Sequence, residues 1–198
     1  MRILLATTNS GKLAEVKQIL GERIEIEIVG LNAAESTEEI ETGKTFIENA
    51  LLKARHYFRI SGIPTIADDS GLEVEALNGA PGIHSARYAG PDAEDKDRIQ
   101  RLIEQMRGVP PQRRRARFTC AAAIVWTSGE KVFEDFVSGK ILEAPRGQAG
   151  FGFDPVFCYE PLGKTFAEIS SSAKAEVSHR GRAFRRLASW LDESRVLG

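Results

Sequence analysis

The chain of 198 residues has only two cysteines, Cys120 and Cys158, and they do not form a CxxC pair. Neither has a histidine cluster near it, so the spacing typical of a zinc or redox centre is missing. Isolated cysteines in apolar segments are common in proteins kept in a reducing compartment. We therefore expect a cytoplasmic protein with free thiols.

Long apolar runs and a strong net charge are also missing. No segment approaches the roughly 20 apolar residues that cross a bilayer, and the N-terminal sequence MRILLATTNS has too short an apolar run for a signal peptide. The formal net charge is -1, so the molecule has no general attraction for a nucleic-acid backbone. These absences predict a soluble protein with no membrane and no nucleic-acid partner, in which local cations meet any anionic ligand.

Hydrophobic residues make up 42% of the chain, enough for one substantial core or at most for two small lobes that share one sheet. We predict a single domain over residues 1–198. Helical and strand-like spacing alternate, which favours an α/β architecture with a mixed sheet. We expect strands at residues 2–7, 24–29, 63–67, 72–77, 118–126, 132–141 and 156–159, and helices starting near residues 11, 45 and 92 and covering 182–191. The strands at 118–126 and 132–141 should form a hairpin.

Two helix starts have capping residues. Thr45 is followed three residues later by Glu48, which predicts a capping box. Asp92 should cap a helix whose inner face carries Ile99, Leu102, Ile103 and Met106.

The first polar cluster follows the first strand and opens the first helix. It comprises Thr7, Thr8, Asn9, Ser10, Gly11 and Lys12. Backbone amides at a helix start can cradle phosphate while a lysine supplies charge. Ala6 and Leu13 stand where a Walker loop needs glycine and Ser or Thr, so this is not that motif. An ordinary capped helix start is the alternative.

Two further clusters carry carboxylates and a lysine. Asn49 and Lys53 lie one turn apart on the second helix, off its apolar stripe, and could face a ligand or form a solvated face. Asp68-Asp69-Ser70-Gly71 comes directly after an apolar strand. Paired carboxylates suit a hard metal and water activation, whereas the alternative is a polar turn held by Asx bonds.

The fourth cluster combines a glycine-rich segment with cations near the C-terminus. Its members are Phe151, Gly152, Phe153, Asp154, Lys174, His179 and Arg180. Glycines let a backbone approach a flat ligand, a phenylalanine can stack on a base, and the histidine and arginine offer donors to a carbonyl. The glycine spacing excludes a Rossmann fingerprint, and His179 could instead cap the last helix.

Five segments together resemble the inosine triphosphate pyrophosphatase family, whose members are also called Ham1-like or RdgB-like. They are TTNSGK (7–12), ETGKTFIENALLKA (41–54), IADDSGLEVEALNGAPGIHSARYAG (66–90), GFGFDPVF (150–157) and SHRG (178–181). The resemblance runs from Leu4 to about Leu187. It implies an α/β fold of the ITPase/Maf-like kind, a long mixed sheet bent between two lobes with flanking helices and the active-site cleft between them, usually in a homodimer.

The resemblance also implies an activity and the residues that perform it. The family hydrolyses ITP, dITP and XTP, triphosphates of non-standard purines, to the monophosphate and pyrophosphate, using Mg²⁺. By position, residues 7–12 match the triphosphate-binding turn, Glu41 and Asp69 the metal ligands, and Asp69 the proton acceptor. Substrate-binding positions are matched by Ser70, Phe151, Gly152, Phe153, Asp154, Lys174, His179 and Arg180.

A mechanism follows from these assignments. Mg²⁺ held by Glu41 and Asp69, with Lys12, Lys53 and Lys174, would offset the triphosphate charge. Asp69, with Asp68 nearby, would deprotonate a water that attacks the α-phosphorus in line. The arginines at 113, 114, 115 and 117 are expected in a solvated loop.

Two alternatives use the same residues differently. An RNA-binding or nucleotide-binding module would stack bases on Phe151 and Phe153 beside the arginines near residue 115. It leaves Asp68 and Asp69 without a role. A metal-free hydrolase would use Ser70 as nucleophile and His179 as base, although the GxSxG elbow is absent.

Overall fold

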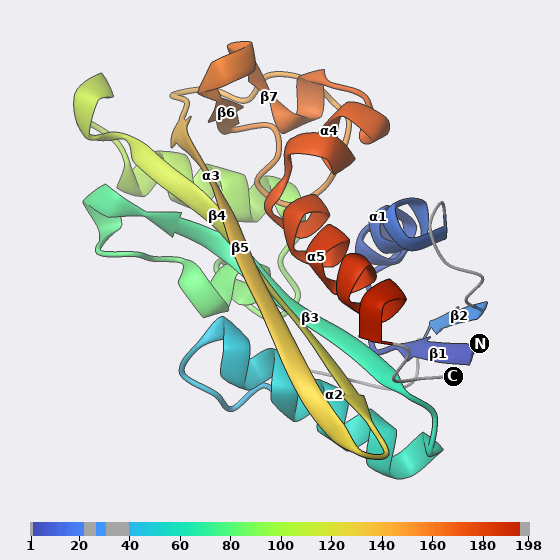
Figure 1. Ribbon diagram of the computed structural model, residues 1–198. Helices are drawn as coiled ribbons and strands as arrows, with labels where there is room; N and C mark the ends of the chain where they lie inside the picture. Colours follow the sequence, from blue (N-terminus) through green and yellow to red (C-terminus); the bar gives the residue numbers. More distant parts are fainter. Residues whose placement is uncertain (1, 22–26, 31–39, 195–198) are drawn as a thin grey trace. The chain divides into compact units, whose positions relative to one another are not determined.

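Strands and α-helices alternate along the chain as far as β4 (Figure 1). The computed structural model describes residues 2–21, 27–30 and 40–194. The strands are β1 (Arg2–Leu5), β2 (Glu27–Gly30), β3 (Thr65–Val74), β4 (Arg115–Trp126), β5 (Gly129–Ile141), β6 (Phe157–Tyr159) and β7 (Lys164–Thr165). The helices are α1 (Ser10–Gly21), α2 (Phe46–Ser61), α3 (Asp95–Gln105), α4 (Ser171–Val177) and α5 (His179–Ser194). In the parts that the structure describes, no helix combines the length and apolarity that a membrane span needs.

The strands form one mixed sheet in the order β2-β1-β3-β4-β5-β6-β7. β1 pairs in parallel with β2 and with β3, whereas β6 pairs antiparallel with β5 and with β7. β4 and β5 are sheet neighbours joined by a turn at residues 127–128, so the predicted hairpin is confirmed. The α/β class with a mixed sheet is confirmed as well.

The chain divides into two compact units. Unit 1 comprises residues 1–69, 120–135 and 179–198. Its core is apolar, with Ile3, Val16, Ala54, Ile124 and Phe184 each fully buried. The helical spacing of α1 directs Val16, Ile19 and Leu20 inward, and α1 packs against α5.

Unit 2 comprises residues 70–119 and 136–178. Phe118, Phe157 and Phe166 form an aromatic cluster, with ring centroids 4.7 Å apart for Phe118 and Phe157 and 5.1 Å for Phe157 and Phe166. Leu72 and Leu102 are buried in the same core. The buried face of α3 is therefore the one that the sequence predicted.

The prediction of separate strands at 63–67 and 72–77, with a polar turn between them, is wrong, because Thr65–Val74 form one continuous strand, β3. Asp68 and Asp69 are buried, with 1% and 5% of their surface exposed. Turn propensity reflects carboxylates that bond to their own backbone. Here side chains from other elements bond to both carboxylates, so the backbone stays extended.

The helix caps differ from the sequence prediction in detail. The Thr45 hydroxyl accepts the Glu48 backbone N–H, as expected, but the Glu48 carboxylate accepts from the N–H of Lys44. The predicted Asp92 cap is wrong, because α3 starts two residues later with Glu94 as its N-cap. Glu94 and Asp97 form the reciprocal capping box there.

Other differences concern element boundaries. The last helix begins at His179, three residues before the predicted start, and α4 was not predicted. Of the strand expected at 24–29, residues 27–29 are in β2 and residues 24–26 lie outside the described residues. Residues 31–39, which include Glu35, Glu38 and Glu39, also lie outside them.

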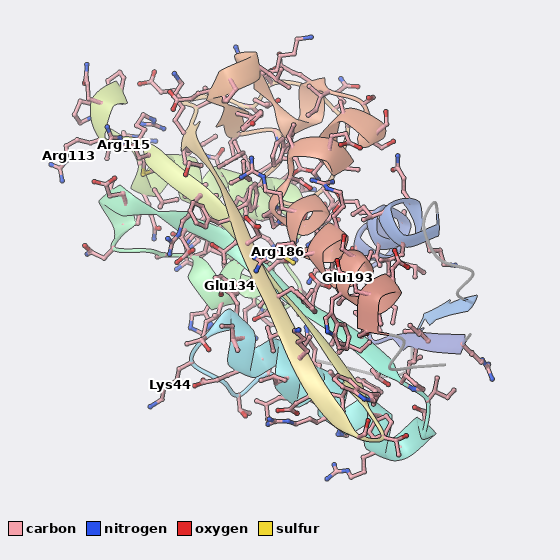
Figure 2. The ribbon with its side chains drawn as sticks, viewed as in Figure 1. Lys44, Arg113, Arg115, Glu134, Arg186 and Glu193 are labelled. Atoms are coloured by element: carbon pink, nitrogen blue, oxygen red, sulfur yellow. The ribbon has the colours of Figure 1, made fainter. Side chains whose placement is uncertain are left out.

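The basic run at 113–117 is not the solvated loop that the sequence suggested. Figure 2 shows Arg113 and Arg115 projecting outward at the start of β4, and Arg113 lies in a short 3-10 turn. Arg114 is 5% exposed. Its guanidinium donates to the carbonyls of Met106, Val109, Ile141 and Leu142.

Candidate active site

The predicted triphosphate turn lies between β1 and α1 in unit 1. Asn9 caps α1, because its Oδ1 accepts the Lys12 backbone N–H at 3.0 Å, and its own N–H donates to Thr7 Oγ1 at 3.2 Å. Thr8 and Ser10 are exposed. The first turn of a helix concentrates N–H donors that lack intrahelical partners. The segment can therefore receive an anion.

The Asp68 carboxylate is the centre of a buried ion cluster in unit 1. Lys12 Nζ lies 3.1 Å from Asp68 Oδ2, and Arg180 Nε lies 3.3 Å from the same oxygen. Arg180 Nη1 also pairs with Glu15 of α1. Asp68 therefore ties the triphosphate turn to the start of α5.

Asp69 has a different set of partners. Its Oδ2 accepts from Asn49 Nδ2 at 3.0 Å, and Asn49 Oδ1 accepts the Gly43 N–H at 2.8 Å. Lys53 Nζ lies 2.5 Å from Glu41 Oε1 and donates to the Asp68 carbonyl at 2.7 Å. The helix face of Asn49 and Lys53 is thus buried against the carboxylates and is not a solvated face.

The two neighbouring aspartates have opposite pKa displacements. Burial alone would raise the pKa of Asp68, but Lys12, Arg180 and Lys53 together hold it well below its usual range. The pKa of Asp69 is raised, chiefly by burial and also by the charge of Glu41, although Lys53 and Lys12 oppose the shift. Asp68 is therefore a fixed anion, whereas Asp69 can take up a proton more readily.

Glu41 and Asp69 are the expected metal ligands, and their environment suits a divalent cation. Three cations, Lys12, Lys53 and Arg180, face four carboxylates, those of Glu15, Glu41, Asp68 and Asp69. The described residues hold no group of three or more His, Cys, Asp or Glu that could bind a metal by itself. Mg²⁺ commonly takes one or two carboxylates together with substrate phosphates, and this pair fits that pattern.

The glycine-rich segment belongs to unit 2. Gly150 and Gly152 have positive φ values of 77° and 60°, and a Cβ on Gly150 would lie 2.1 Å from Asp154 Oδ2. That same oxygen accepts the Phe151 backbone N–H at 2.9 Å and pairs with Lys174 Nζ. Glycine is therefore required at Gly150 for both conformation and space.

Three predicted substrate residues are more enclosed than the sequence suggested. Lys174 is 4% exposed, and its ammonium lies 4.6 Å from the centre of the half-buried Phe151 ring. Phe153 is 3% exposed in the core of unit 2, with its ring edge-to-face with Tyr88. A ring buried in this way cannot serve as a stacking surface for RNA, which weakens that alternative.

The remaining predicted residues occupy element boundaries. Ser70 follows Asp69 in β3 and is half-buried in unit 2, while His179 is the first residue of α5 in unit 1 and is 4% exposed. Arg180 is 2% exposed and bonded to Asp68 and Glu15. Arg180 therefore holds these two carboxylates in place.

Sequence reasoning missed two residues of this cluster. Glu15 lies on α1 and pairs with Arg180. Its position three residues after Lys12, on the same helix face, was the available signal. Cys120 Sγ lies 4.0 Å from Asp68 Oδ2, and burial raises the pKa of its thiol. No spacing rule links β4 to Asp68, so this contact could be found only from the folded structure.

Unit 2 also has a cavity of about 600 Å³, but it contains none of the predicted site residues. Its lining includes Glu73, Arg115, Arg117, Ser138 and Glu160. Glu73 bonds to Arg117 and Thr119. The charges around this cavity are mixed in sign, and the chemistry described above lies elsewhere.

A model of the Ham1 family matches residues 3–190. The chain belongs to the Ham1 family. Among its relatives, a Syntrophobacter fumaroxidans protein named dITP/XTP pyrophosphatase is 49% identical over 193 residues, covering 96% of this chain and 82% of the relative. A Vibrio cholerae protein with the same name is 44% identical, with 98% of each chain covered.

Solved Ham1 structures have the same fold. A HAM1 protein from Coxiella burnetii matches with a TM-score of 0.85 and 39% identity, over 98% of this chain and 99% of that one. The Staphylococcus aureus Ham1 protein also gives a TM-score of 0.85, at 38% identity, over 98% of this chain and 100% of that one. The resemblance inferred from the sequence motifs is confirmed at the family level.

Proposed function

We propose that this protein hydrolyses the triphosphates of non-standard purines, ITP, dITP and XTP, to the monophosphate and pyrophosphate. The observation that carries the proposal is the pair of adjacent carboxylates in β3, with Asp68 bonded to Lys12 and Arg180 and Asp69 bonded to Asn49. Ham1 relatives at 42 to 49% identity are named dITP/XTP pyrophosphatases, which supports the same reaction here.

The triphosphate is received at the start of α1. Thr8, Ser10 and Lys12 lie in the first turn or just before it, where backbone donors and the helix dipole favour phosphate. The Lys12 side chain keeps 17% of its surface exposed, compared with 4% for Lys53. Lys12 is therefore the cation of this cluster best placed to contact a phosphate oxygen.

Glu41 and Asp69 would hold Mg²⁺, in agreement with the excess of carboxylates over cations in this cluster. When bound, the ion supplies positive charge that stabilises the triphosphate and the departing pyrophosphate. Lys53 holds Glu41, and Asn49 holds Asp69. These buried partners fix both carboxylates before substrate arrives.

Asp69 orients a water and takes its proton as that water attacks the α-phosphorus. Asp69 is bonded to the neutral side chain of Asn49, whereas Asp68 is bonded to Lys12 and Arg180, so Asp69 is the better proton acceptor of the two. Asp68 cannot perform this step easily, because Lys12 and Arg180 stabilise its charged form. The neighbouring aspartates thus have distinct tasks, one structural and one chemical.

Base recognition is assigned to Phe151, by stacking, and to His179, by donation to the 6-oxo group. Hypoxanthine and xanthine present an acceptor at position 6, where adenine presents an amino donor. An adenine facing a donor would leave a buried polar group unpaired, at a cost of about 1 to 3 kcal/mol. Arg180 supports this recognition less directly, since it is bonded to Asp68 and Glu15.

The experiment is an incubation with Mg²⁺ and, separately, ITP, XTP, dITP, ATP and GTP, with pyrophosphate and orthophosphate resolved. We expect pyrophosphate and monophosphate, fastest from ITP, dITP or XTP, and no turnover with EDTA. Orthophosphate alone, or equal rates with ATP, would overturn the proposal. EDTA-insensitive turnover would support Ser70 and His179 as a metal-free pair instead.

The family resemblance also supports a homodimer in the cytoplasm as the working form. Light scattering on the purified protein tests the first point. A mass of about twice the 21.8 kDa of one chain supports the dimer, and a monomer at working concentration contradicts it.

A further inference from the structure

The segment that carries Phe151 is held by two carboxylates within unit 2. The Phe151 N–H donates to Asp154 Oδ2 at 2.9 Å, and the next N–H, that of Gly152, donates to Asp95 Oδ2 at 2.6 Å. Asp95 lies 57 residues away, in the first turn of α3. Two successive peptides are therefore fixed, one by the segment itself and one from outside it.

Asp95 is not needed to cap its own helix. Glu94 and Asp97 already form the reciprocal capping box of α3. The other oxygen of Asp95, Oδ1, pairs with Arg98 Nη1 one turn later, which turns the carboxylate so that Oδ2 faces Gly152. The Asp95 side chain is still 43% exposed, so burial of its own surface does not explain its position.

The bond to Gly152 bears directly on the Phe151 ring. Gly152 has a φ of 60°. Glycine adopts many backbone conformations with similar ease, so this residue does not hold the loop in one conformation without an external bond. Lys174 lies 4.6 Å from the centre of the ring and pairs with Asp154. Both peptides that flank Phe151 are therefore held by carboxylates, and the Lys174 ammonium lies against the ring itself.

We propose that Asp95 is a positioning residue for nucleotide binding, which holds the Gly152 peptide and thereby presents the Phe151 ring to the purine. The inference rests on the proposed function. Asp95 acts on the base-binding surface and takes no part in phosphate chemistry. Its loss should therefore raise KM much more than it lowers kcat.

The test compares Asp95→Ala, Asp95→Asn and Asp97→Ala with the wild-type protein. Asp95→Ala removes the carboxylate that accepts the Gly152 N–H. Because a hydrogen bond to a charged group is among the stronger ones, we expect the KM for ITP to rise about tenfold. We expect kcat to change by less than about twofold. Asp95→Asn keeps an acceptor oxygen and should restore most of the affinity.

Asp97→Ala is the matched control, because it removes a cap bond to the Glu94 N–H in the same turn of α3 without touching Gly152. Its KM should equal that of the wild type. The amide resonance of Gly152 gives a readout without turnover. In Asp95→Ala it should move upfield and exchange faster, and in Asp97→Ala it should not.

The outcomes separate this inference from the function on which it rests. A wild-type protein that neither turns over nor binds ITP overturns both. Normal wild-type turnover with unchanged KM in Asp95→Ala overturns the role of Asp95 alone. Equal KM increases in Asp95→Ala and Asp97→Ala would also overturn it, because they would indicate general loosening of α3.

Discussion

Asp68 and Asp69 are adjacent in one strand, and yet their surroundings differ in charge. Side chains alternate across a strand, so the two carboxylates point to opposite faces of β3. One meets Lys12 and Arg180, and the other meets Asn49. The sequence predicted the pair and its chemistry, but it could not assign the tasks, because the partners come from α1, α2 and α5.

Replacing Asp69 by asparagine should separate activity from stability. We expect kcat to fall by about 10² to 10⁴-fold, the usual contribution of a general base. Because burial raises the pKa of Asp69, its charged form costs folding free energy above that pKa. The neutral variant should be as stable at pH 7 as the wild type, or more so, in urea unfolding. An Asp69→Asn variant that folds normally and keeps full turnover would contradict the mechanism.

Replacing Asp68 by asparagine should, in contrast, lower the free energy of unfolding. Removing one partner from a buried ion cluster leaves uncompensated charge and costs about 3 to 5 kcal/mol. Because the folded pKa of Asp68 is lowered, its stabilisation is complete above the ordinary value of 3.8 and is lost as the pH falls through the lowered pKa. Urea unfolding at several pH values measures the difference. A variant as stable as the wild type at pH 7 would contradict the ion cluster.

The raised pKa of Asp69 can be measured in the metal-free protein by carbon-13 NMR titration. We expect a pKa above the ordinary 3.8. Glu41→Gln removes a negative charge that raises this pKa, so the variant should titrate at lower pH. No movement, or movement upward, would show that Glu41 does not act on Asp69.

At the scale of elements, Arg114 connects the end of α3 with the start of β4 and the end of β5. It is buried and donates to four carbonyls. Arg114→Met should lower the free energy of unfolding by about 3 kcal/mol, because buried carbonyls lose a charged donor. Arg115→Met, at an exposed site, should change it by less than about 0.5 kcal/mol. Equal effects in urea unfolding would contradict this role.

The elements also show where sequence patterns succeed. Periodicity located α2, the buried face of α3 and the β4–β5 hairpin. It failed at Asp68-Asp69-Ser70-Gly71, since local turn propensity was outweighed by bonds from distant side chains. It failed at Arg114 because a run of four arginines within five residues is typical of a solvent-exposed segment. Arg114 differs from its neighbours only because the fold places the carbonyls of Met106, Ile141 and others around its guanidinium.

At the scale of the molecule, the five motifs and their order along the chain were sufficient to predict the family, and the alternation of helical and strand-like spacing predicted the mixed sheet. The single domain over residues 1–198 and the cleft between two lobes stay predictions. They depend on the placement of distant segments, about which periodicity carries no information. Within unit 1, by contrast, the predicted residues Lys12, Glu41, Lys53 and Arg180 belong to one network of charges and hydrogen bonds that meets at Asp68. Asp69, the next residue of the strand, is bonded to Asn49.

In the proposed reaction, water attacks the α-phosphorus of a purine nucleoside triphosphate. Hydrolysis of ITP in water enriched in oxygen-18, followed by mass spectrometry of both products, tests it directly. We expect one labelled oxygen in the monophosphate and none in pyrophosphate. Label in pyrophosphate would place the attack at the β-phosphorus and contradict the role given to Asp69.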